Sequence, residues 1–223
     1  MQGLVRSVNV GTPREAAWAG IGRTSIDKVA VAGPVEVRRL GLGGDQVSDT
    51  RHHGGADQAV YAFAREELDW WAAQLGTDLR DGEFGENLTT EGVVVDDAEL
   101  GERWRIGTTL LEVASVRTPC HDFKTWMGRG GHDSRGWVRR FAEHGHPGAY
   151  LRVLQEGTLQ EGDPVEVVHR PGHGVTMRTA FRAAMGEPEL LPRLLEVDGL
   201  AVKLRRRAED HVAASYRSVG VVN

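Results

Sequence analysis

Residues 103–113 read RWRIGTTLLEV, two runs of side chains that are separated by Gly107 and Thr108. The first run alternates between charged and apolar residues, which is the period of a strand with one buried face. The second run carries apolar residues on both faces, as in a strand that is buried on both sides. A glycine-containing pair between two such runs is typical of a β-hairpin. The stretch therefore predicts a protein whose main structure is a β-sheet.

Short runs of the same kind lie on both sides of this hairpin. Residues 4–10 and 34–40 alternate between apolar and polar side chains, and residues 149–154 and 165–168 form a later pair that brackets two turn signals. The chain has 29 glycines, and most of them separate such runs in its first three quarters. This spacing is more typical of a strand-rich domain than of a helical bundle.

One helix is predicted inside the strand-rich region, over residues 65–76. Gly76 suits its C-terminal end. Four apolar residues fall at positions i, i+3, i+4 and i+7, the spacing of one helix face: Leu68, Trp71, Ala72 and Leu75. We expect Trp71 to pack into the core, with Trp70 at the edge of the same face.

The composition changes at residues 169–174, which read HRPGHG and are expected to form a linker. Beyond them the pattern becomes helical. Thr176 can cap a first helix, Pro188 suits the start of a second, and Asp198 precedes a long arginine-rich third helix that ends near residue 215.

The predicted fold is mainly β with α, in two domains. Residues 1–170 form the strand-rich domain, and residues 175–217 form a small three-helix domain packed against it. We find no internal repeat and no low-complexity stretch in the sequence.

The composition excludes several classes of protein. Of the 223 residues, 40% are hydrophobic and 26% are charged, which is ordinary for a folded domain and argues against wholesale disorder. The net charge of −5 argues against a protein that coats nucleic acid, because such domains carry an excess of basic residues. The single cysteine, Cys120, excludes an intramolecular disulfide and any all-cysteine zinc or iron–sulfur site.

The sequence carries no sign of export or membrane insertion. It begins MQGLVRSVNVGTP, which lacks the basic start and apolar core of a signal peptide. Its apolar runs all fall short of the ~18 residues that a membrane-spanning helix needs. We therefore expect a soluble, cytoplasmic protein without a membrane partner.

Four clusters of residues could carry chemistry, and the first is residues 22–28, GRTSIDK. It places Arg23, Lys28 and two hydroxyl groups in an expected loop, where they could hold a phosphate through charge-assisted hydrogen bonds. A solvated turn explains the same residues and is the better explanation of this segment taken alone.

The second cluster, residues 41–55, reads GLGGDQVSDTRHHGG, and its glycines allow the backbone to approach a ligand closely. It matches neither the dinucleotide-binding fingerprint nor the Walker A loop. His52 and His53 could bind a metal, but neighbours on an extended strand point to opposite faces, so at most one of them serves a given site. A lone histidine is more often structural than functional.

The third cluster is residues 84–88, FGENL. The carboxamide of Asn87 offers both a donor and an acceptor with which to recognise the edge of a heterocycle. A tight turn in which Asn87 bonds its own backbone is an equally good interpretation.

The fourth cluster is residues 117–122, RTPCHD, at the end of a strand that is expected to be buried. Pro119 stops the strand and fixes the backbone before Cys120. Arg117 and His121 would favour the thiolate at the mouth of a pocket. The alternatives are an inert buried cysteine and a cysteine–histidine hydrolase, although no hydrolase motif surrounds this cysteine.

Taken in this order, the four clusters resemble the MOSC domain, the C-terminal module of molybdenum cofactor sulfurases, and above all its standalone bacterial YiiM type. The resemblance covers residues 1–170 through the motifs G-R-T-S-I-D-K, G-D-x-x-x-D-x-x-x-H-G-G, F-G-E-N-L and R-x-P-C. The tail from Val175 is similar to the three-helix domain that often follows in YiiM-type proteins.

The resemblance implies a MOSC-like β-barrel that binds molybdenum cofactor (Mo-molybdopterin). Cys120 would be a catalytic residue and the protein's thiolate ligand to the metal. The phosphate and pterin of the cofactor would lie against four residues in the matching motifs: Arg23, Lys28, Asn87 and Arg117. His53, as a second catalytic residue, and Gly54 and Gly55 would lie near the metal or the pterin.

The activity that the resemblance implies is reduction of small N-hydroxylated compounds, such as hydroxylaminopurines, to amines. His53 or Asp122 would help to deliver protons. Electrons would come from a separate flavin or iron–sulfur reductase, because the chain has no such motif of its own. A pyridoxal phosphate cofactor is not expected, and a homodimer is compatible with the sequence.

Two other functions remain open at the level of sequence. In one, Cys120 carries a persulfide and passes sulfur to metal-cofactor assembly. In the other, the basic residues of the last helix dock a nucleic acid or a protein, although they are more typical of a solvated surface: Lys203, Arg205, Arg206 and Arg207. We expect the reductase, then the sulfur carrier, and do not expect a nucleic-acid partner.

Overall fold

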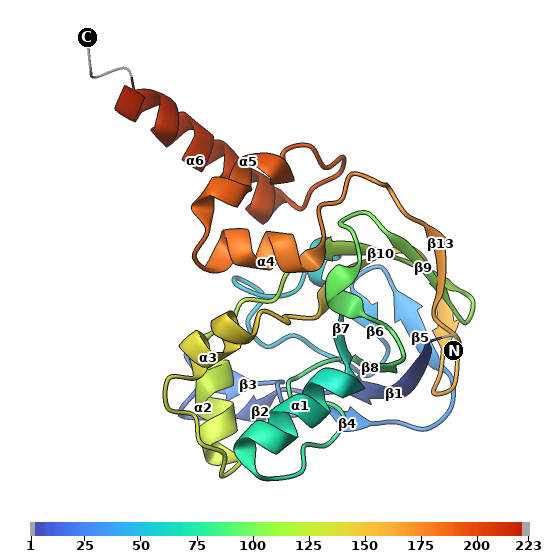
Figure 1. Cartoon of the computed structure of the whole chain (residues 1–223). Coiled ribbons are helices and arrows are strands. Elements are labelled where there is room, and N and C mark those ends of the chain that lie inside the picture. Colours follow the sequence, from blue (N-terminus) through green and yellow to red (C-terminus); the bar gives the residue numbers. More distant parts are fainter. Residues whose placement is uncertain (1–2, 220–223) are drawn as a thin grey trace.

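The hairpin predicted at residues 103–113 is confirmed in the computed structural model, which describes residues 3–219 (Figure 1). Strands β9 (Arg103–Ile106) and β10 (Thr109–Ser115) pair antiparallel, with Thr109 opposite Ile106 across the turn. Thr109 ties the turn by donating its hydroxyl to the Ile106 carbonyl at 2.7 Å. Trp104 and Ile106 are fully buried on one face of β9, as the alternation requires.

The hairpin belongs to an eight-stranded mixed sheet in the order β13-β9-β10-β11-β7-β8-β1-β4. All its neighbours are antiparallel except β7 and β8, which run parallel because helix α1 connects them. The other strands of this sheet are β1 (Leu4–Val10), β4 (Val29–Ala30), β7 (Val60–Ala64), β8 (Leu88–Glu91), β11 (Ala149–Gln155) and β13 (Glu166–His169).

Two small sheets complete the strand-rich part. One has the order β12-β5-β6, and the other pairs β2 with β3. Their bounds are β2 (Arg14–Glu15), β3 (Arg23–Thr24), β5 (Val35–Arg38), β6 (Gly41–Leu42) and β12 (Gly157–Leu159). The fold is therefore a mixed α/β fold with a large mixed sheet, which agrees in part with the expected mainly β class.

The first and last strands of the fold approach each other. Leu4 forms an antiparallel bridge with Pro164, and Val5 donates its N–H to the Asp163 carbonyl at 2.9 Å. These bonds join β1 to the segment that leads into β13. Closure of the large sheet into a complete barrel stays a prediction.

The two late runs at residues 149–154 and 165–168 are strands, but they do not pair with each other. Strand β11 lies between β10 and β7, and β13 pairs with β9 at the edge. The short strand β12 between them joins the second sheet through β5.

Helix α1 (Arg65–Leu75) confirms the predicted helix. Gly76 ends it in the left-handed conformation, with φ of 66°, and donates its N–H to the Ala72 carbonyl. Trp71 is 1% exposed and Trp70 is 40% exposed, as the periodicity predicts.

The prediction that this is the one helix among residues 1–170 is wrong. Two more short helices, α2 (His121–Arg129) and α3 (Trp137–His144), follow β10. Each buries an i, i+4 pair on one face: Phe123 and Met127 in α2, Trp137 and Phe141 in α3. Glycines within α2 and between the two helices interrupt the helical spacing of apolar residues. Neither helix was therefore predicted from the sequence.

An aromatic cluster joins these helices to the sheet. Its members, all fully buried or nearly so, are Phe63, Trp71, Phe84, Phe123, Trp137 and Phe141. Phe84 lies 5.1 Å from Phe123 and 5.2 Å from Phe63 between ring centroids, so it bridges α2 and β7. Phe141 extends the cluster to Phe181 of the tail at 6.0 Å. The cluster therefore fixes α1, α2, α3 and the tail in one core.

The tail is helical, as predicted. Helix α4 (Met177–Met185) begins at the Thr176 cap, whose hydroxyl accepts from the Thr179 N–H, and α5 (Leu191–Leu194) and α6 (Val202–Val219) follow. A 3-10 helix, η3 (Pro188–Leu190), begins at Pro188 as predicted and leads into α5, and two others, η1 (Ala56–Gln58) and η2 (Val95–Asp97), lie before the tail. Figure 1 shows α6 extending outward from the rest of the molecule.

The last helix begins at Val202, four residues later than Asp198 suggested. The division into domains at residues 170–175 stays a prediction. Within the described residues 3–219, no helix combines the length and the apolar character that crossing a membrane would require.

The aromatic cluster yields a stability prediction. Replacing Phe141 by alanine should lower the free energy of unfolding by about 3–5 kcal/mol, because a fully buried ring leaves a cavity between α3 and the tail. Val138→Ala is the matched control on the same helix, since Val138 is 38% exposed and should change this free energy by less than about 0.5 kcal/mol. Urea denaturation measures both, and equal losses would contradict the packing described.

Candidate functional site

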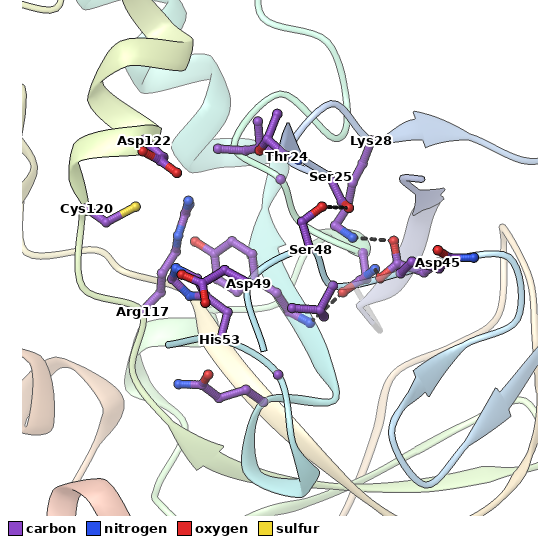
Figure 2. A pocket seen from close by; sticks show the side chains of 18 of the residues that line it. Thr24, Ser25, Lys28, Asp45, Ser48, Asp49, His53, Arg117, Cys120 and Asp122 are labelled. Carbon is purple, nitrogen blue, oxygen red and sulfur yellow. Dashed lines mark hydrogen bonds and ion pairs between the residues drawn. The ribbon is translucent and has the colours of Figure 1, made fainter. Parts of the chain in front are cut away.

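Residues from all four sequence clusters line one pocket (Figure 2). The pocket has a volume of about 790 Å³, including the part that is open to solvent. Of the predicted site residues, it is lined by Arg23, Lys28, His53, Gly54, Asn87, Arg117, Cys120 and Asp122. Figure 2 shows Cys120 and Asp122 on one side of the pocket and Lys28 and Asp45 on the other.

Cys120 caps the N-terminus of α2 at the edge of the pocket. Its sulfur accepts the N–H of Phe123 at 3.4 Å, so the thiol faces the positive end of the helix dipole. The strand before it ends at Ser115, not at the arginine and cysteine as predicted. The cysteine is thus presented by a helix start, and it is half-buried beside the pocket.

Arg117 lies buried beneath the pocket. Its Nη1 donates to the Phe84 carbonyl at 2.6 Å, and its guanidinium stacks 3.9 Å above the Phe123 ring and 5.0 Å from the Tyr61 ring. Burial by itself would lower the pKa of Arg117. The neighbouring Tyr61, Tyr150 and Cys120 together raise it by more, so its pKa lies above the ordinary value. The pocket floor therefore carries a permanent positive charge next to the only cysteine.

The two adjacent histidines face different surroundings. His53 is half-buried and lines the pocket, whereas His52 is exposed and its Nδ1 lies 2.8 Å from the carboxylate of Asp49. They lie on a turn, closed by a bond from His53 N–H to the Asp49 carbonyl, and not on the extended strand that the sequence argument assumed. The expectation that at most one of the two histidines serves the site agrees with this placement. The reason given for it, an extended strand, is wrong.

Burial lowers the pKa of His53 below its ordinary value, and the charge of Arg117 lowers it further. These surroundings therefore disfavour the protonated form of His53. Gly54 lines the pocket beside it, while Gly55 caps the 3-10 helix η1 and is not among the lining residues.

Lys28 and Asn87 are both committed to partners inside the protein. Lys28 forms a buried ion pair with Asp45, which also accepts the Gly11 N–H at 2.7 Å. Burial lowers the pKa of Lys28, and the nearby Asp45 carboxylate opposes that shift. The Lys28 charge is thus balanced before any ligand arrives.

The carboxamide of Asn87 holds three strands together. Its Oδ1 accepts the Tyr61 N–H at 3.1 Å, and its Nδ2 donates to Asp45 at 2.9 Å and to the Asn9 carbonyl at 3.2 Å. It neither bonds its own backbone nor points a free donor at the pocket. Both of the interpretations made from sequence therefore miss its partners.

The remaining polar groups lie at the rim. Arg23, on β3, is exposed and lines the mouth of the pocket. The hydroxyls of Ser25 and Ser48 are hydrogen-bonded to each other at 2.6 Å. Asp122 accepts the Gly20 N–H at 3.2 Å, which fixes its carboxylate near Cys120. His121 does not line the pocket, and its Nε2 lies 3.3 Å from the Thr125 hydroxyl.

Sequence reasoning missed two acidic residues that shape the site. Asp45 is the first, and Glu86 is the second: it is fully buried and accepts from the Gly82 and Phe84 N–H groups and from the Thr89 hydroxyl. Burial raises the pKa of Glu86 to about 7, against the pull of these hydrogen bonds. An acidic residue inside the apolar F-G-E-N-L segment was the available signal for a buried carboxyl group.

Comparison with known proteins places this pocket in a family. The model of the family described as MOSC domain matches residues 49–166 of this chain. The YflK protein of Bacillus subtilis is 30% identical over 179 residues, which cover 80% of this chain and 79% of that protein. A protein of Gibberella moniliformis named a reductase is 29% identical over 176 residues, which cover 76% of this chain but only 30% of that protein.

Solved structures agree with the sequence comparisons. The crystal structure of YiiM from Geobacillus stearothermophilus superposes with a TM-score of 0.77 at 26% identity, covering 94% of this chain and 98% of that one. The predicted YiiM-type resemblance is confirmed.

The buried pair below the pocket yields a second prediction. Asp45→Asn should lower the free energy of unfolding by about 3–5 kcal/mol, because it leaves the Lys28 ammonium buried without its partner. The double variant Lys28→Met/Asp45→Asn should lose less than the sum of the two single variants, with a coupling of roughly 1–3 kcal/mol.

The matched control is Asp133→Asn, which breaks the exposed pair with Arg135 and should change the free energy of unfolding by less than about 1 kcal/mol. Urea denaturation of the four variants measures these terms. Additive losses in the double variant would contradict the buried ion pair.

Proposed function

The chain belongs to the MOSC domain family, and from that premise we propose that it uses molybdenum cofactor to reduce small N-hydroxylated compounds to amines. In this proposal Cys120 supplies the protein's ligand to the metal, and the pocket beside it receives the substrate. Electrons come from a separate flavin or iron–sulfur protein, since Cys120 is the only cysteine of this chain.

The observation that carries the proposal is the position of Cys120. The only cysteine of the chain lies at the N-terminus of α2, on the wall of the pocket where the four motifs meet. A thiolate is the donor that suits a metal held in a sulfur-rich coordination sphere. The N-terminus of α2 and the guanidinium of Arg117 place partial and full positive charge beside this sulfur.

The other residues of the pocket fit a phosphorylated heterocycle in part. Arg117 and Arg23 provide positive charge at the floor and at the rim, and the hydroxyls of Ser25 and Ser48 provide donors. Lys28 is already paired with Asp45, so its contribution to an anion is weaker than the sequence suggested.

Within the reaction, the cofactor supplies two-electron chemistry at the oxygen that leaves the substrate nitrogen. The balance is one hydroxylamine, two electrons and two protons giving one amine and one water. His53 and Asp122 are two of the titratable groups that line the pocket, and in this proposal they carry those protons. The relative from Gibberella moniliformis that is named a reductase supports this class of reaction.

Metal analysis tests the cofactor. The wild-type protein, purified from a host that makes molybdenum cofactor, should contain near-stoichiometric molybdenum and pterin, and Cys120→Ser should lose the metal. His52→Gln is the matched control, because His52 points away from the pocket, and it should keep both. The host must load a second molybdenum enzyme in the same experiment.

Absence of molybdenum from the wild-type protein in that host would contradict the proposal and favour the sulfur carrier. Mass spectrometry of intact protein would then be expected to show a persulfide on Cys120, with the additional sulfur absent from Cys120→Ser. Molybdenum that remains in Cys120→Ser would contradict the ligand assignment alone.

The proton-delivery role of His53 gives a separate prediction. With a reduced dye as electron donor, His53→Gln should lower kcat by about 10²-fold or more while the bound molybdenum is unchanged. Because burial lowers the pKa of His53, the protonated donor is depleted as pH rises, and the wild-type kcat should fall from acidic toward neutral pH. His53→Gln should flatten this dependence and His52→Gln should preserve it; identical profiles in all three proteins would contradict the role.

A further inference from the structure

Four side chains with metal-binding groups meet outside the pocket, where α1, η2 and the end of α3 come together. They are Glu67, Asp96, His144 and His146, and none of them lines the pocket described above. We propose that these four residues form a binding site for one divalent transition-metal ion of the Zn²⁺ type, in which Glu67, His144 and His146 are the ligands and Asp96 lies beside them.

The donor atoms already converge on one point. Glu67 places one carboxylate oxygen 2.5 Å from His144 Nε2 and the other 2.9 Å from His146 Nδ1, and Asp96 Oδ2 lies 3.2 Å from the same Nδ1. One ligand atom from each of Glu67, His144 and His146 lies within 4.8 Å of the others. Tetrahedral zinc, with bonds of about 2.0–2.2 Å, holds its ligand atoms roughly 3.3–3.6 Å apart. The Glu67 carboxylate and the two imidazoles would therefore have to move apart by roughly 1 Å to admit the ion.

The donor set matches the chemistry of zinc. Imidazole and carboxylate are ligands that Zn²⁺ takes in four-coordinate sites. Hydrogen bonds with Asp96 and Glu67 raise the pKa of His146 to about 9, so the ion must displace a proton from this imidazole. Asp96 is 2% exposed, and two such carboxylates in a partly buried place favour a cation between them.

Neighbouring groups hold the donors in place. Trp70 stacks on the His144 ring at 3.6 Å between centroids, and the second oxygen of Asp96 accepts the Gly148 N–H at 2.9 Å. Contacts of this kind orient metal ligands in known sites. Three protein ligands leave a fourth coordination position, and the Asp96 carboxylate lies next to His146.

Arg178, on α4, opposes the ion in the present arrangement. Its Nη1 lies 3.0 Å from His146 Nε2, and its Nη2 lies 3.3 Å from Asp97. When His146 binds metal through Nδ1, its Nε2 carries a proton and cannot accept from Arg178. The guanidinium must then keep Asp97 as its partner. Arg178→Met should therefore bind the ion more tightly than the wild-type protein.

The site also bears on the loop that supports the pocket. His144, His146 and Asp96 hold residues 145–148, in which the Pro147 carbonyl accepts the hydroxyl of Tyr61 at 2.8 Å. Tyr61 lines the pocket. An ion bound at the four residues would fix this loop through bonds that are independent of Cys120.

Zinc titration of the full-length protein, stripped with a chelator, tests the proposal. Calorimetry with ZnCl₂ and native mass spectrometry should show one bound ion, and saturating zinc should raise Tm by about 5–10 °C. His146→Gln and Glu67→Gln should bind at least about 100-fold more weakly. His169→Gln, an exposed histidine on β13, is the matched control and should bind as the wild-type protein does.

A cobalt spectrum tests the site in protein whose four proposed residues are all intact. Co²⁺ added to wild-type protein and to Cys120→Ser should give the same intense visible bands of a four-coordinate nitrogen–oxygen site, with no sulfur charge-transfer band. Three results would overturn the proposal: no zinc binding by the wild-type protein at micromolar concentration, a sulfur band that disappears in Cys120→Ser, or full binding by His146→Gln.

Discussion

The carboxylate of Asp45 bonds three segments that are far apart in the sequence. It accepts from the Gly11 N–H after β1, from the Lys28 ammonium after β3, and from the Asn87 carboxamide before β8. Asn87 in turn accepts the Tyr61 N–H of β7. A buried charge persists only where its hydrogen-bonding capacity is filled, so this network holds the pocket wall in one arrangement.

The pocket floor contains a second buried charge, the guanidinium of Arg117, which is accommodated in a different way. Arg117 is buried between aromatic rings, with the Phe84 carbonyl as a hydrogen-bond acceptor. Phe84 is also the centre of the aromatic cluster that packs α1, α2 and α3. The position of Cys120 at the start of α2 therefore follows from core packing: the residues that bury α2 also place its N-terminus at the pocket.

Local pattern was sufficient for the hairpin at residues 103–113, for α1 and for the helical tail, because each signal lies within a few residues of chain. The resemblance to the MOSC domain, and not local pattern, implied that Cys120, Arg117 and His53 share one site. Local pattern missed α2 and α3, whose apolar pairs are only four residues apart and are flanked by glycines.

The roles of Lys28 and Asn87 depend on Asp45, which lies 17 and 42 positions away from them. No local pattern specifies partners at that separation. From the motifs alone, Lys28 and Asn87 look free to donate hydrogen bonds to a ligand. Only the structure shows that both already donate to Asp45. The sequence therefore predicted that these four motifs share a pocket, but not the partners of their charged and polar side chains.

The tail shows the same dependence on distant partners. Lys203 donates to the His52 carbonyl at 2.7 Å, while Arg205 and Arg207 donate to carbonyls of Val197 and Ala184. Basic residues that looked like a solvated face thus bond within the chain, and Lys203 reaches the turn that carries His53. Its charge adds to that of Arg117 in lowering the pKa of His53. Lys203 of the helical tail thus has two effects on this turn. It holds the backbone of His52 through a hydrogen bond, and its charge disfavours protonation of His53.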